Sequence, residues 1–270
     1  MRIAELEVGR IGFGAMRVID NPDIWGPPKD RENARRVLRR AYELGATFFD
    51  TAESYGPGHS ESSIAEALHP YPKDLVIGTK CGLVRPNRHR WDPDGRPEKL
   101  RKELEGSLKR LRLERIDLYQ LHAPDPNVPF EESVGALADF QREGKVRHIG
   151  LSNVSVEELE QARKIVPIVS VQNCYNLGDR SSEEVLNACE RLRIVFIPWY
   201  PLGVGRTLRM SKVKALAQKL GATPSQVVIA WLLKKSPMML PIPGTGSVAH
   251  LEENMGALTV ALDDGDFREL

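Results

Sequence analysis

The chain has 270 residues, of which 41% are hydrophobic and 28% charged, and its formal net charge is +1. These values are typical of a globular protein, α/β barrels commonly have this length, and the charge gives no reason to expect binding to nucleic acid or to a membrane surface. The three cysteines are too few for a disulfide framework, no apolar run approaches the ~20 residues of a membrane helix, and the N-terminus lacks a signal-peptide core, so we expect a cytoplasmic protein with reduced thiols.

Strand and helix patterns alternate through the first half of the chain. After Gly12-Phe13-Gly14, apolar residues at helical spacing predict a helix that starts near Asp30 and ends at Gly45. Short apolar runs predict buried strands, and leucines at i, i+4 and i+8 predict a long helix that begins with a proline. The predicted segments are strand 46–49, helix 61–68, strand 75–79, helix 97–111 and strand 116–121.

The same alternation continues through the second half. Ser155 with Glu158 three residues later is a capping-box pattern, and Thr223-Pro224 is a second helix start. The predicted segments are helix 130–142, strand 146–151, a helix from 155, strand 168–171, helix 185–192, strand 195–199, helices 212–220 and 224–235, strand 240–243 and helix 248–258.

About eight strand–helix units in one register predict an α/β fold, a single-domain (β/α)8 TIM barrel over residues 1–270. An open doubly wound sheet is the alternative, but the stretch from Gly12 to Arg17 lacks the third glycine of G-x-G-x-x-G. Two stretches rich in proline and glycine, 21–29 and 85–97, follow strands and should be long loops on the catalytic face. We expect the basic cluster from Arg85 to Arg90 to be solvated there.

Four polar residues at or just beyond the ends of predicted strands suggest a proton-donating site. They are Asp50, Tyr55, Lys80 and His122. In a barrel, residues at the carboxyl ends of successive strands meet at one face. Each alone has an ordinary structural explanation, such as a cap, a packed aromatic or a solvated charge, but together they are hard to explain in that way.

The chemistry of these four side chains suits the reduction of a carbonyl group. A phenol has a pKa of about 10, and a nearby ammonium lowers it by favouring the phenolate. We expect Lys80 to act in this way on Tyr55, and Asp50 to hold Lys80 in place. His122 would donate a hydrogen bond to the carbonyl oxygen or relay a proton.

Seven stretches of the chain, in this order, make it resemble the aldo-keto reductase family. They are FFDTAESYG from Phe48, IGTKCG, LYQLHAPD, GKVRHIGLSN, VQNCYN, PWYPLG and IPGTGSVAHLEEN. The resemblance implies a (β/α)8 barrel that reduces aldehydes or ketones with NAD(P)H. It also implies that Asp50, Tyr55, Lys80 and His122 are the catalytic tetrad, with Tyr55 as the acid.

The resemblance also implies a set of cofactor contacts. Ser152, Asn153 and Gln172 would bind the nicotinamide carboxamide, Trp199 would stack on the ring, and Pro201, Leu202 and Gly203 would line the path of the pyrophosphate. Gly244, Thr245, Gly246, Ser247 and His250 would follow, and Glu253 and Asn254 would hold the adenine.

The segment from Gly244 to His250 departs from the pattern of many family members, because it has no lysine or arginine to bind the 2′-phosphate of NADPH. A helix N-terminus beginning at Ser247 would still attract a phosphate, and Arg206 or Arg209 would be within range on the preceding loop. We expect NADPH to be preferred, with reduced discrimination against NADH.

The substrate side is defined less clearly. Met16, Trp25 and Trp91 are the expected walls of the pocket, favouring flat or apolar carbonyl compounds. Phrases such as WGPPKDREN and LGATPSQV resemble a bacterial subgroup that includes pyridoxal reductases, which makes pyridoxal a possible substrate. Beyond this small molecule we expect no partner except, at most, a weak homo-oligomer of a monomeric enzyme.

Two other functions were considered. A cofactor-binding sensor or regulatory barrel would not need a complete proton-donating site. A metal-dependent hydrolase would need closely spaced ligands such as H-x-H, and the six histidines show no such spacing, so we expect no metal.

Overall fold

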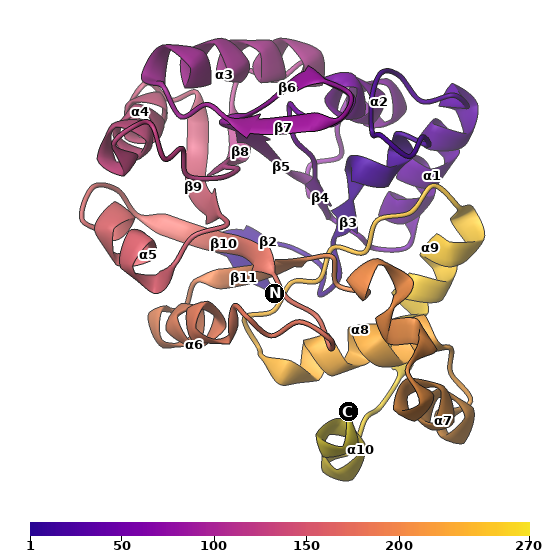
Figure 1. Cartoon of the computed structure of the whole chain (residues 1–270). Coiled ribbons are helices and arrows are strands. Elements are labelled where there is room, and N and C mark those ends of the chain that lie inside the picture. Colours follow the sequence, from indigo (N-terminus) through magenta and orange to yellow (C-terminus); the bar gives the residue numbers. More distant parts are fainter.

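Seven parallel strands form one curved sheet around the centre of the molecule (Figure 1). The computed structural model describes all residues from 1 to 270. The strand order is β11-β10-β9-β8-β5-β4-β3, so each strand pairs with its neighbour in the sequence of barrel strands. The bounds are β3 (Phe13–Gly14), β4 (Phe48–Asp50), β5 (Val76–Cys81), β8 (Ile116–Leu121), β9 (Val146–Ser152), β10 (Ile168–Cys174) and β11 (Val195–Trp199).

An irregular segment closes the barrel where an eighth strand was expected at 240–243. Met239 forms an isolated parallel bridge with Phe196, and the amide of Leu240 donates to the carbonyl of Phe196. On the other side, the amide of Gly12 donates to the carbonyl of Pro241 at 2.9 Å. Prolines 241 and 243 have no N–H to donate, so no regular strand forms. The closed sheet excludes the doubly wound alternative and gives the expected (β/α)8 barrel.

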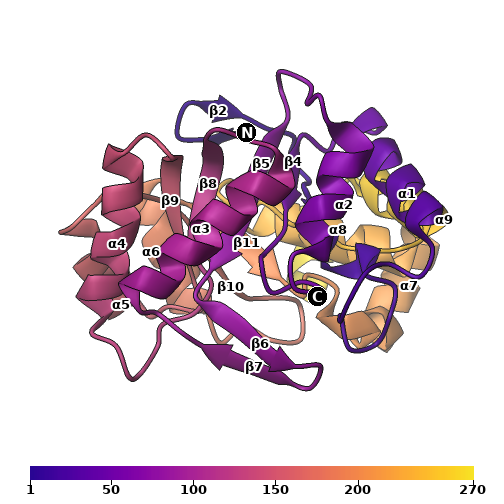
Figure 2. The ribbon, with the colours of Figure 1, turned by 90° about the horizontal axis from the view of Figure 1, so that it is seen from above.

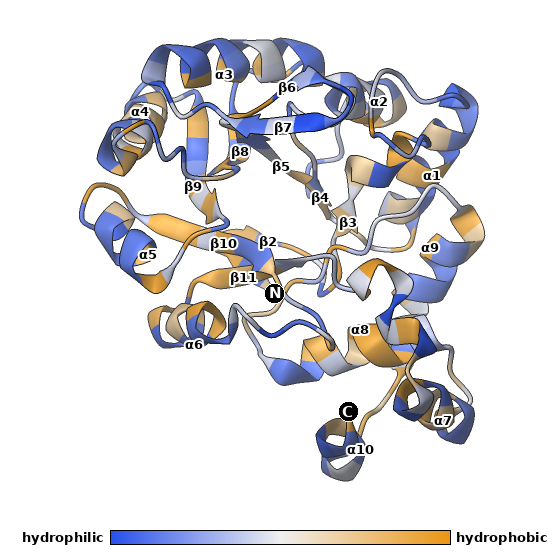
Figure 3. Cartoon of the chain, in the orientation of Figure 1, coloured by the Kyte–Doolittle hydropathy of each residue, from blue (hydrophilic) through white to orange (hydrophobic).

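Helices cover the outside of the sheet and follow the expected positions closely. α3 (Pro97–Leu111), α4 (Phe130–Arg142) and α8 (Pro224–Lys235) have the predicted bounds. Both predicted capping boxes form, at Ser155 and at Thr223. The other predicted helices are α1 (Arg31–Glu43), α2 (His59–Leu68), α5 (Val156–Arg163), α6 (Glu183–Leu192), α7 (Ser211–Leu220) and α9 (Val248–Met255). A last helix, α10 (Asp264–Glu269), was not predicted. Their outer faces are hydrophilic and the strands mostly hydrophobic (Figure 3), and no helix has the length and apolarity to cross a membrane.

Two hairpins that were not predicted lie at opposite ends of the barrel (Figure 2). At one end, β1 (Arg2–Ile3) pairs with β2 (Leu6–Glu7), and Ile3 and Leu6 join the apolar cluster inside the barrel. At the other end, β6 (Leu83–Asn87) pairs with β7 (Arg90–Pro93). The second hairpin occupies the stretch that was expected to be a loop, on the side where the strands end.

Candidate active site

The four candidate catalytic residues converge at the carboxyl end of the barrel. Asp50 is the last residue of β4, Lys80 lies near the end of β5, and His122 directly follows β8. Tyr55 lies in the loop between β4 and α2. All four side chains are buried, with exposed fractions of 0% for Lys80, 2% for Asp50, and 8% for both Tyr55 and His122.

Lys80 lies at the centre of this group. Its Nζ donates to Asp50 Oδ2 at 2.6 Å and to the carbonyl of Thr51 at 2.8 Å. The same nitrogen lies 3.5 Å from the Tyr55 hydroxyl. The second carboxylate oxygen of Asp50 accepts hydrogen bonds from the side chains of Gln172 at 2.8 Å and Gln120 at 3.2 Å. The ion pair is therefore fixed from both sides, as a buried pair must be to offset its desolvation.

His122 lies beside the phenol. The two rings meet edge to face, with centroids 5.8 Å apart. The Nδ1 atom of His122 is 3.4 Å from the hydroxyl of Ser54, the residue that precedes Tyr55. The carbonyl of His122 accepts a hydrogen bond from Asn153 at 2.8 Å, which ties its backbone to the end of β9.

Burial changes the acid–base properties of all three titratable partners. Burial raises the pKa of Tyr55 above its usual value, and the charge of Lys80 offsets this only in part. Burial disfavours the ammonium of Lys80, but Asp50 and Tyr55 outweigh this effect and raise the pKa of Lys80. Burial, with a smaller contribution from Lys80, holds the pKa of His122 well below its usual range. Contrary to the expectation of a lowered phenol pKa, Tyr55 is therefore protonated, with a charged lysine and a neutral histidine beside it.

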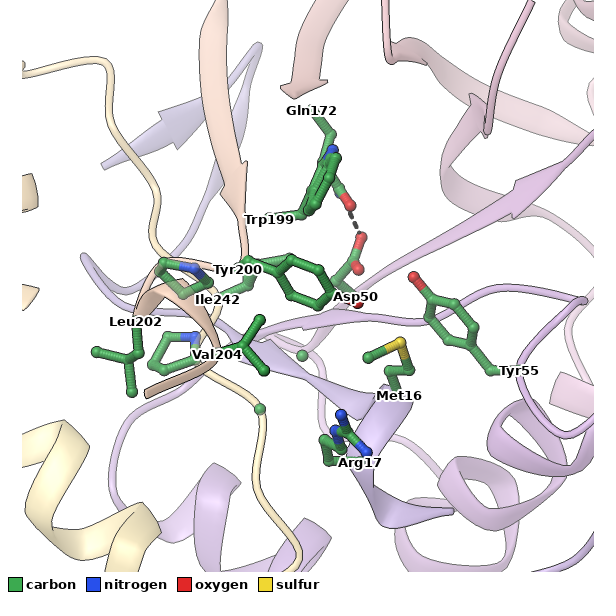
Figure 4. Close-up of a pocket in the computed structure, with 14 residues that line it drawn as sticks. Met16, Arg17, Asp50, Tyr55, Gln172, Trp199, Tyr200, Leu202, Val204 and Ile242 are labelled. Carbon is green, nitrogen blue, oxygen red and sulfur yellow. Dashed lines mark hydrogen bonds between the residues drawn. The ribbon is translucent and has the colours of Figure 1, made fainter. Parts of the chain in front are cut away.

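A pocket of about 160 Å³ opens beside Asp50 and Tyr55 (Figure 4). Six further residues expected at the site line it with them: Met16, Gln172, Trp199, Pro201, Leu202 and Gly244. Gln172 reaches into the pocket and donates to Asp50, as the dashed line in Figure 4 indicates. Its Oε1 atom has no hydrogen-bond partner in the protein.

The four residues expected near the nicotinamide form a connected network. The Ser152 hydroxyl donates to the carbonyl of Gln172 at 2.7 Å, and Asn153 donates to the Ser152 hydroxyl at 3.1 Å. Asn153 Oδ1 accepts a hydrogen bond from the indole of Trp199 at 3.0 Å. Asn153 has a φ of 58°, a left-handed conformation that asparagine tolerates better than most residues. The network fixes the orientation of the half-buried indole at the pocket wall.

The remaining expected cofactor residues lie farther from the tetrad. Thr245 and Gly246 line a shallow hollow that adjoins the pocket through Gly244. Ser247 caps α9, where its hydroxyl accepts from the amide of His250 at 3.4 Å. Ser247 lines neither the pocket nor this hollow, and the same holds for His250, Glu253 and Asn254. His250 is exposed, Glu253 is half-buried and accepts a hydrogen bond from Ser225, and Asn254 is buried. Gly203 lies in the hollow on the other side of Tyr200, together with Arg206.

Six residues of the pocket were missed in the sequence: Gly14, Arg17, Tyr200, Val204, Ile242 and Pro243. Tyr200, Ile242 and Pro243 lie within the motifs PWYPLG and IPGTGSVAHLEEN, and Val204 directly follows the first of these. Arg17 is the exception, because it lies in a short 3-10 helix after β3, η1 (Ala15–Val18), which carries no recognised motif. Its half-buried guanidinium makes no ion pair and no hydrogen bond within the protein, and it lines both the pocket and the hollow next to Gly244. The signal in the sequence that could have identified Arg17 is a basic residue shortly after the first barrel strand.

The expected substrate walls divide into two groups. Met16 lines the pocket, and Trp91 lines an adjoining hollow and meets the Tyr55 ring edge-on at 6.3 Å. Trp25 lines neither space. Its backbone is held by Asn21, and its ring packs against Arg85, so it is an anchor of the loop and not a wall. Arg85 itself is buried, contrary to the expected solvated cluster.

Comparisons with known proteins place this site in a family. The family model of the aldo/keto reductases matches residues 10–270. Pyridoxine 4-dehydrogenase of Escherichia coli is 43% identical over 95% of this chain and 92% of the relative. Among solved structures, a glycerol dehydrogenase of Gluconobacter oxydans superimposes with a TM-score of 0.90 at 28% identity, covering 99% of this chain and 92% of the other.

A second solved structure, an aldo/keto reductase of Klebsiella pneumoniae in complex with NADP and acetate, has a TM-score of 0.81 at 25% identity. It covers 97% of this chain and 90% of its own. The family model matches nearly the whole chain, and the solved structures superimpose on nearly the whole barrel. The sequence and the fold thus indicate the same family. The chain therefore belongs to the aldo-keto reductase family and is an NAD(P)H-dependent oxidoreductase.

Proposed function

We propose that the protein reduces small aldehydes or ketones to alcohols with NADPH, and that Tyr55 gives the proton. The observation that carries this proposal is the Tyr55 hydroxyl, which lies 3.5 Å from the Lys80 ammonium at the wall of the pocket. A phenol that burial keeps protonated is an acid at neutral pH, and an adjacent cation stabilises the phenolate left behind.

The other three residues would make this proton transfer possible. Asp50 holds Lys80 charged and fixed in place through their 2.6 Å contact. In the tautomer in which Nδ1 of His122 accepts from the Ser54 hydroxyl, the neutral imidazole carries its proton on Nε2 and can donate it to a substrate oxygen. Such a donor stabilises negative charge that develops on that oxygen.

Features of the pocket fit a nicotinamide dinucleotide. Trp199 offers a half-buried indole held by Asn153, and Gln172 offers a free amide oxygen to a carboxamide. Arg17 offers an unpaired guanidinium for phosphate charge, with Gly244, Thr245 and Gly246 along the same wall. When bound, the cofactor supplies the hydride that the protein cannot supply itself.

We propose that Arg17 partly replaces the cation that is missing after Gly244. Arg206, considered for this role, lines the hollow beyond Tyr200 and not the one that holds Thr245. NADPH should therefore be preferred, with modest discrimination against NADH. A ratio of kcat/KM that favours NADH would overturn this preference.

Pyridoxal is the named substrate we propose to test first. The support is the 43% identity to pyridoxine 4-dehydrogenase and a pocket entrance flanked by Trp91 and Tyr200, which suits a flat ring. The assay is consumption of NADPH with a panel of aldehydes that includes pyridoxal and aliphatic aldehydes of similar size. Tight NADPH binding without consumption by any of them would favour the sensor alternative.

A further inference from the structure

Arg85 is a buried cation on the substrate side of the site that has no carboxylate partner. Its exposed fraction is 8%, whereas Arg88 and Arg90 of the same hairpin are exposed. Val84 pairs with Asp92 while Asn87 pairs with Arg90, so β6 contains one extra residue at this point. A bulge of this kind redirects a side chain, and here Arg85 is the residue of the hairpin that turns inward.

Every N–H group of the Arg85 guanidinium donates to a backbone carbonyl. A guanidinium has five such donors in a fixed plane, and here five carbonyls from three separate segments accept them. Nε donates to Arg90 at 3.1 Å, Nη1 to Ile24 at 3.0 Å and Ser54 at 3.4 Å, and Nη2 to Asp23 at 2.9 Å and Arg88 at 2.7 Å.

Two indole rings complete the surroundings of Arg85. Its guanidinium carbon lies 3.7 Å from the centroid of the Trp91 ring and 5.3 Å from that of Trp25. Aromatic faces and carbonyl dipoles thus replace the usual carboxylate as partners of the buried charge. Trp25 lies in the loop after β3 and Trp91 in strand β7, so the cation joins two separate segments.

Arg85 reaches Tyr55 by two routes. The first runs through the carbonyl of Ser54, whose next residue is Tyr55 and whose hydroxyl approaches His122. The second runs through Trp91, which meets the Tyr55 ring edge-on. The loop of Trp25 is tied to the same place, because the amide of Gly56 donates to the carbonyl of Ile24.

We propose that Arg85 is a positioning residue that fixes the substrate side of the active site. It holds loop 20–29, the Ser54–Tyr55 segment and the β6–β7 hairpin as one unit, so that the phenol and the Trp91 wall are in place before substrate binds. The kinetic part of this inference rests on the proposed role of Tyr55. Lysine cannot substitute, since an ammonium has three donors and no planar face.

The test compares Arg85→Lys and Arg85→Gln with Arg90→Gln, a matched control on the same hairpin whose side chain is exposed and pairs only with Asp92. For both Arg85 variants we expect the KM for an aromatic aldehyde to rise about tenfold and kcat to fall, because loops that must be ordered at each binding event weaken it. The Kd for NADPH should change by less than about twofold, since Arg85 does not line the cofactor pocket. The control should match the wild type.

The proposal is overturned if Arg85→Lys retains the wild-type KM and kcat, or if substrate and cofactor affinities fall together. If the variants do not fold, hydrogen exchange on the wild-type protein provides the test. The amide of Trp25 donates to Asn21, and the amide of Gly56 donates to Ile24. Both should have the same protection factor as the amides of the β6–β7 hairpin, because the three segments open together. Unrelated protection factors would contradict a single unit.

The same exchange measurement separates this inference from the proposed function. Tyr55→Phe keeps the ring that meets Trp91, so it should leave the protection of the three segments unchanged. If Tyr55→Phe kept full turnover, the proposed role of Tyr55 would be wrong. The exchange measurement would still decide whether Arg85 holds the three segments together.

Discussion

The Lys80 ammonium and the Asp50 carboxylate form an ion pair 2.6 Å long that is almost completely excluded from solvent. In the interior such a pair is maintained only when further hydrogen bonds satisfy both partners, as Gln172 and the Thr51 carbonyl do here. Removing one partner leaves the other charge buried and alone. This pair is therefore the part of the site most sensitive to single substitutions.

Substitution of either partner should damage catalysis, and the two effects should not add. We expect Asp50→Asn and Lys80→Met each to lower kcat by about 100-fold or more. Lys80→Met removes the ammonium that stabilises the Tyr55 phenolate, and Asp50→Asn removes the carboxylate that keeps this ammonium charged and in place. The double variant should be little worse than the poorer single variant, since the residues act as a unit. Fully additive losses in steady-state kcat would show that they act independently.

His122 should remain neutral over the whole working pH range. Its folded pKa lies well below that of the unfolded chain because of burial. The native state therefore resists protonation, and its contribution to stability is lost as pH falls below about 6.5. We expect the unfolding free energy of the wild type to fall more steeply than that of His122→Gln between about pH 7 and about pH 5. Denaturant titrations at several pH values measure this free energy. If it falls with pH equally steeply in both proteins, the assignment of a neutral, buried His122 is contradicted.

Glu53 should give stability the opposite dependence on pH. Burial, with the nearby Glu103 charge, raises the pKa of Glu53 to about 7, although Arg110 acts against this shift. The folded state keeps the proton while the unfolded chain has lost it, so stability falls as pH rises from about 4.5 to about 7. We expect Glu53→Gln to gain about 2–3 kcal/mol relative to the wild type at about pH 8, compared with about pH 4.5.

Two matched unfolding titrations measure this difference. The comparison between the two proteins cancels the groups that titrate independently of Glu53. A relative stability of Glu53→Gln that does not change with pH would mean that the fold does not raise the pKa of Glu53.

Arg17 should contribute to cofactor affinity. We expect Arg17→Ala to raise the Kd for NADPH by about tenfold or more, because a hydrogen bond to a charged group is worth about 1.5–3 kcal/mol. Arg209→Ala is the control, since that side chain is exposed and lines no part of the pocket. Quenching of tryptophan fluorescence by NADPH measures the Kd of each variant. Equal Kd values for the two variants would remove Arg17 from the cofactor site.

Regular elements were predictable from local patterns, but irregular ones were not. α3 has leucines along one face and a proline at its first position, so its bounds follow from its own residues. The segment after Met239 looks like a strand because it is apolar, yet its prolines cannot complete a hydrogen-bond ladder. The β6–β7 hairpin is rich in arginine, proline and asparagine, which are typical of loops.

The four candidate catalytic residues could be located in the sequence because each lies at or just beyond the end of a strand. Arg17 and Arg85 could not be assigned in the same way. The burial of Arg85 depends on the carbonyl of Ile24 and the rings of Trp25 and Trp91, which come from separate segments and leave no local pattern. The raised pKa of Tyr55 likewise follows from burial that spacing alone does not show.

The most direct test of the account is the turnover of Tyr55→Phe with NADPH and an aldehyde substrate. This change removes only the hydroxyl beside Lys80 and keeps the ring packed against His122 and Trp91. We predict that kcat falls by about 100-fold or more, because the proton donor is gone, while the Kd for NADPH stays within about twofold of the wild type. Turnover close to that of the wild type would contradict the assignment of Tyr55 as the acid.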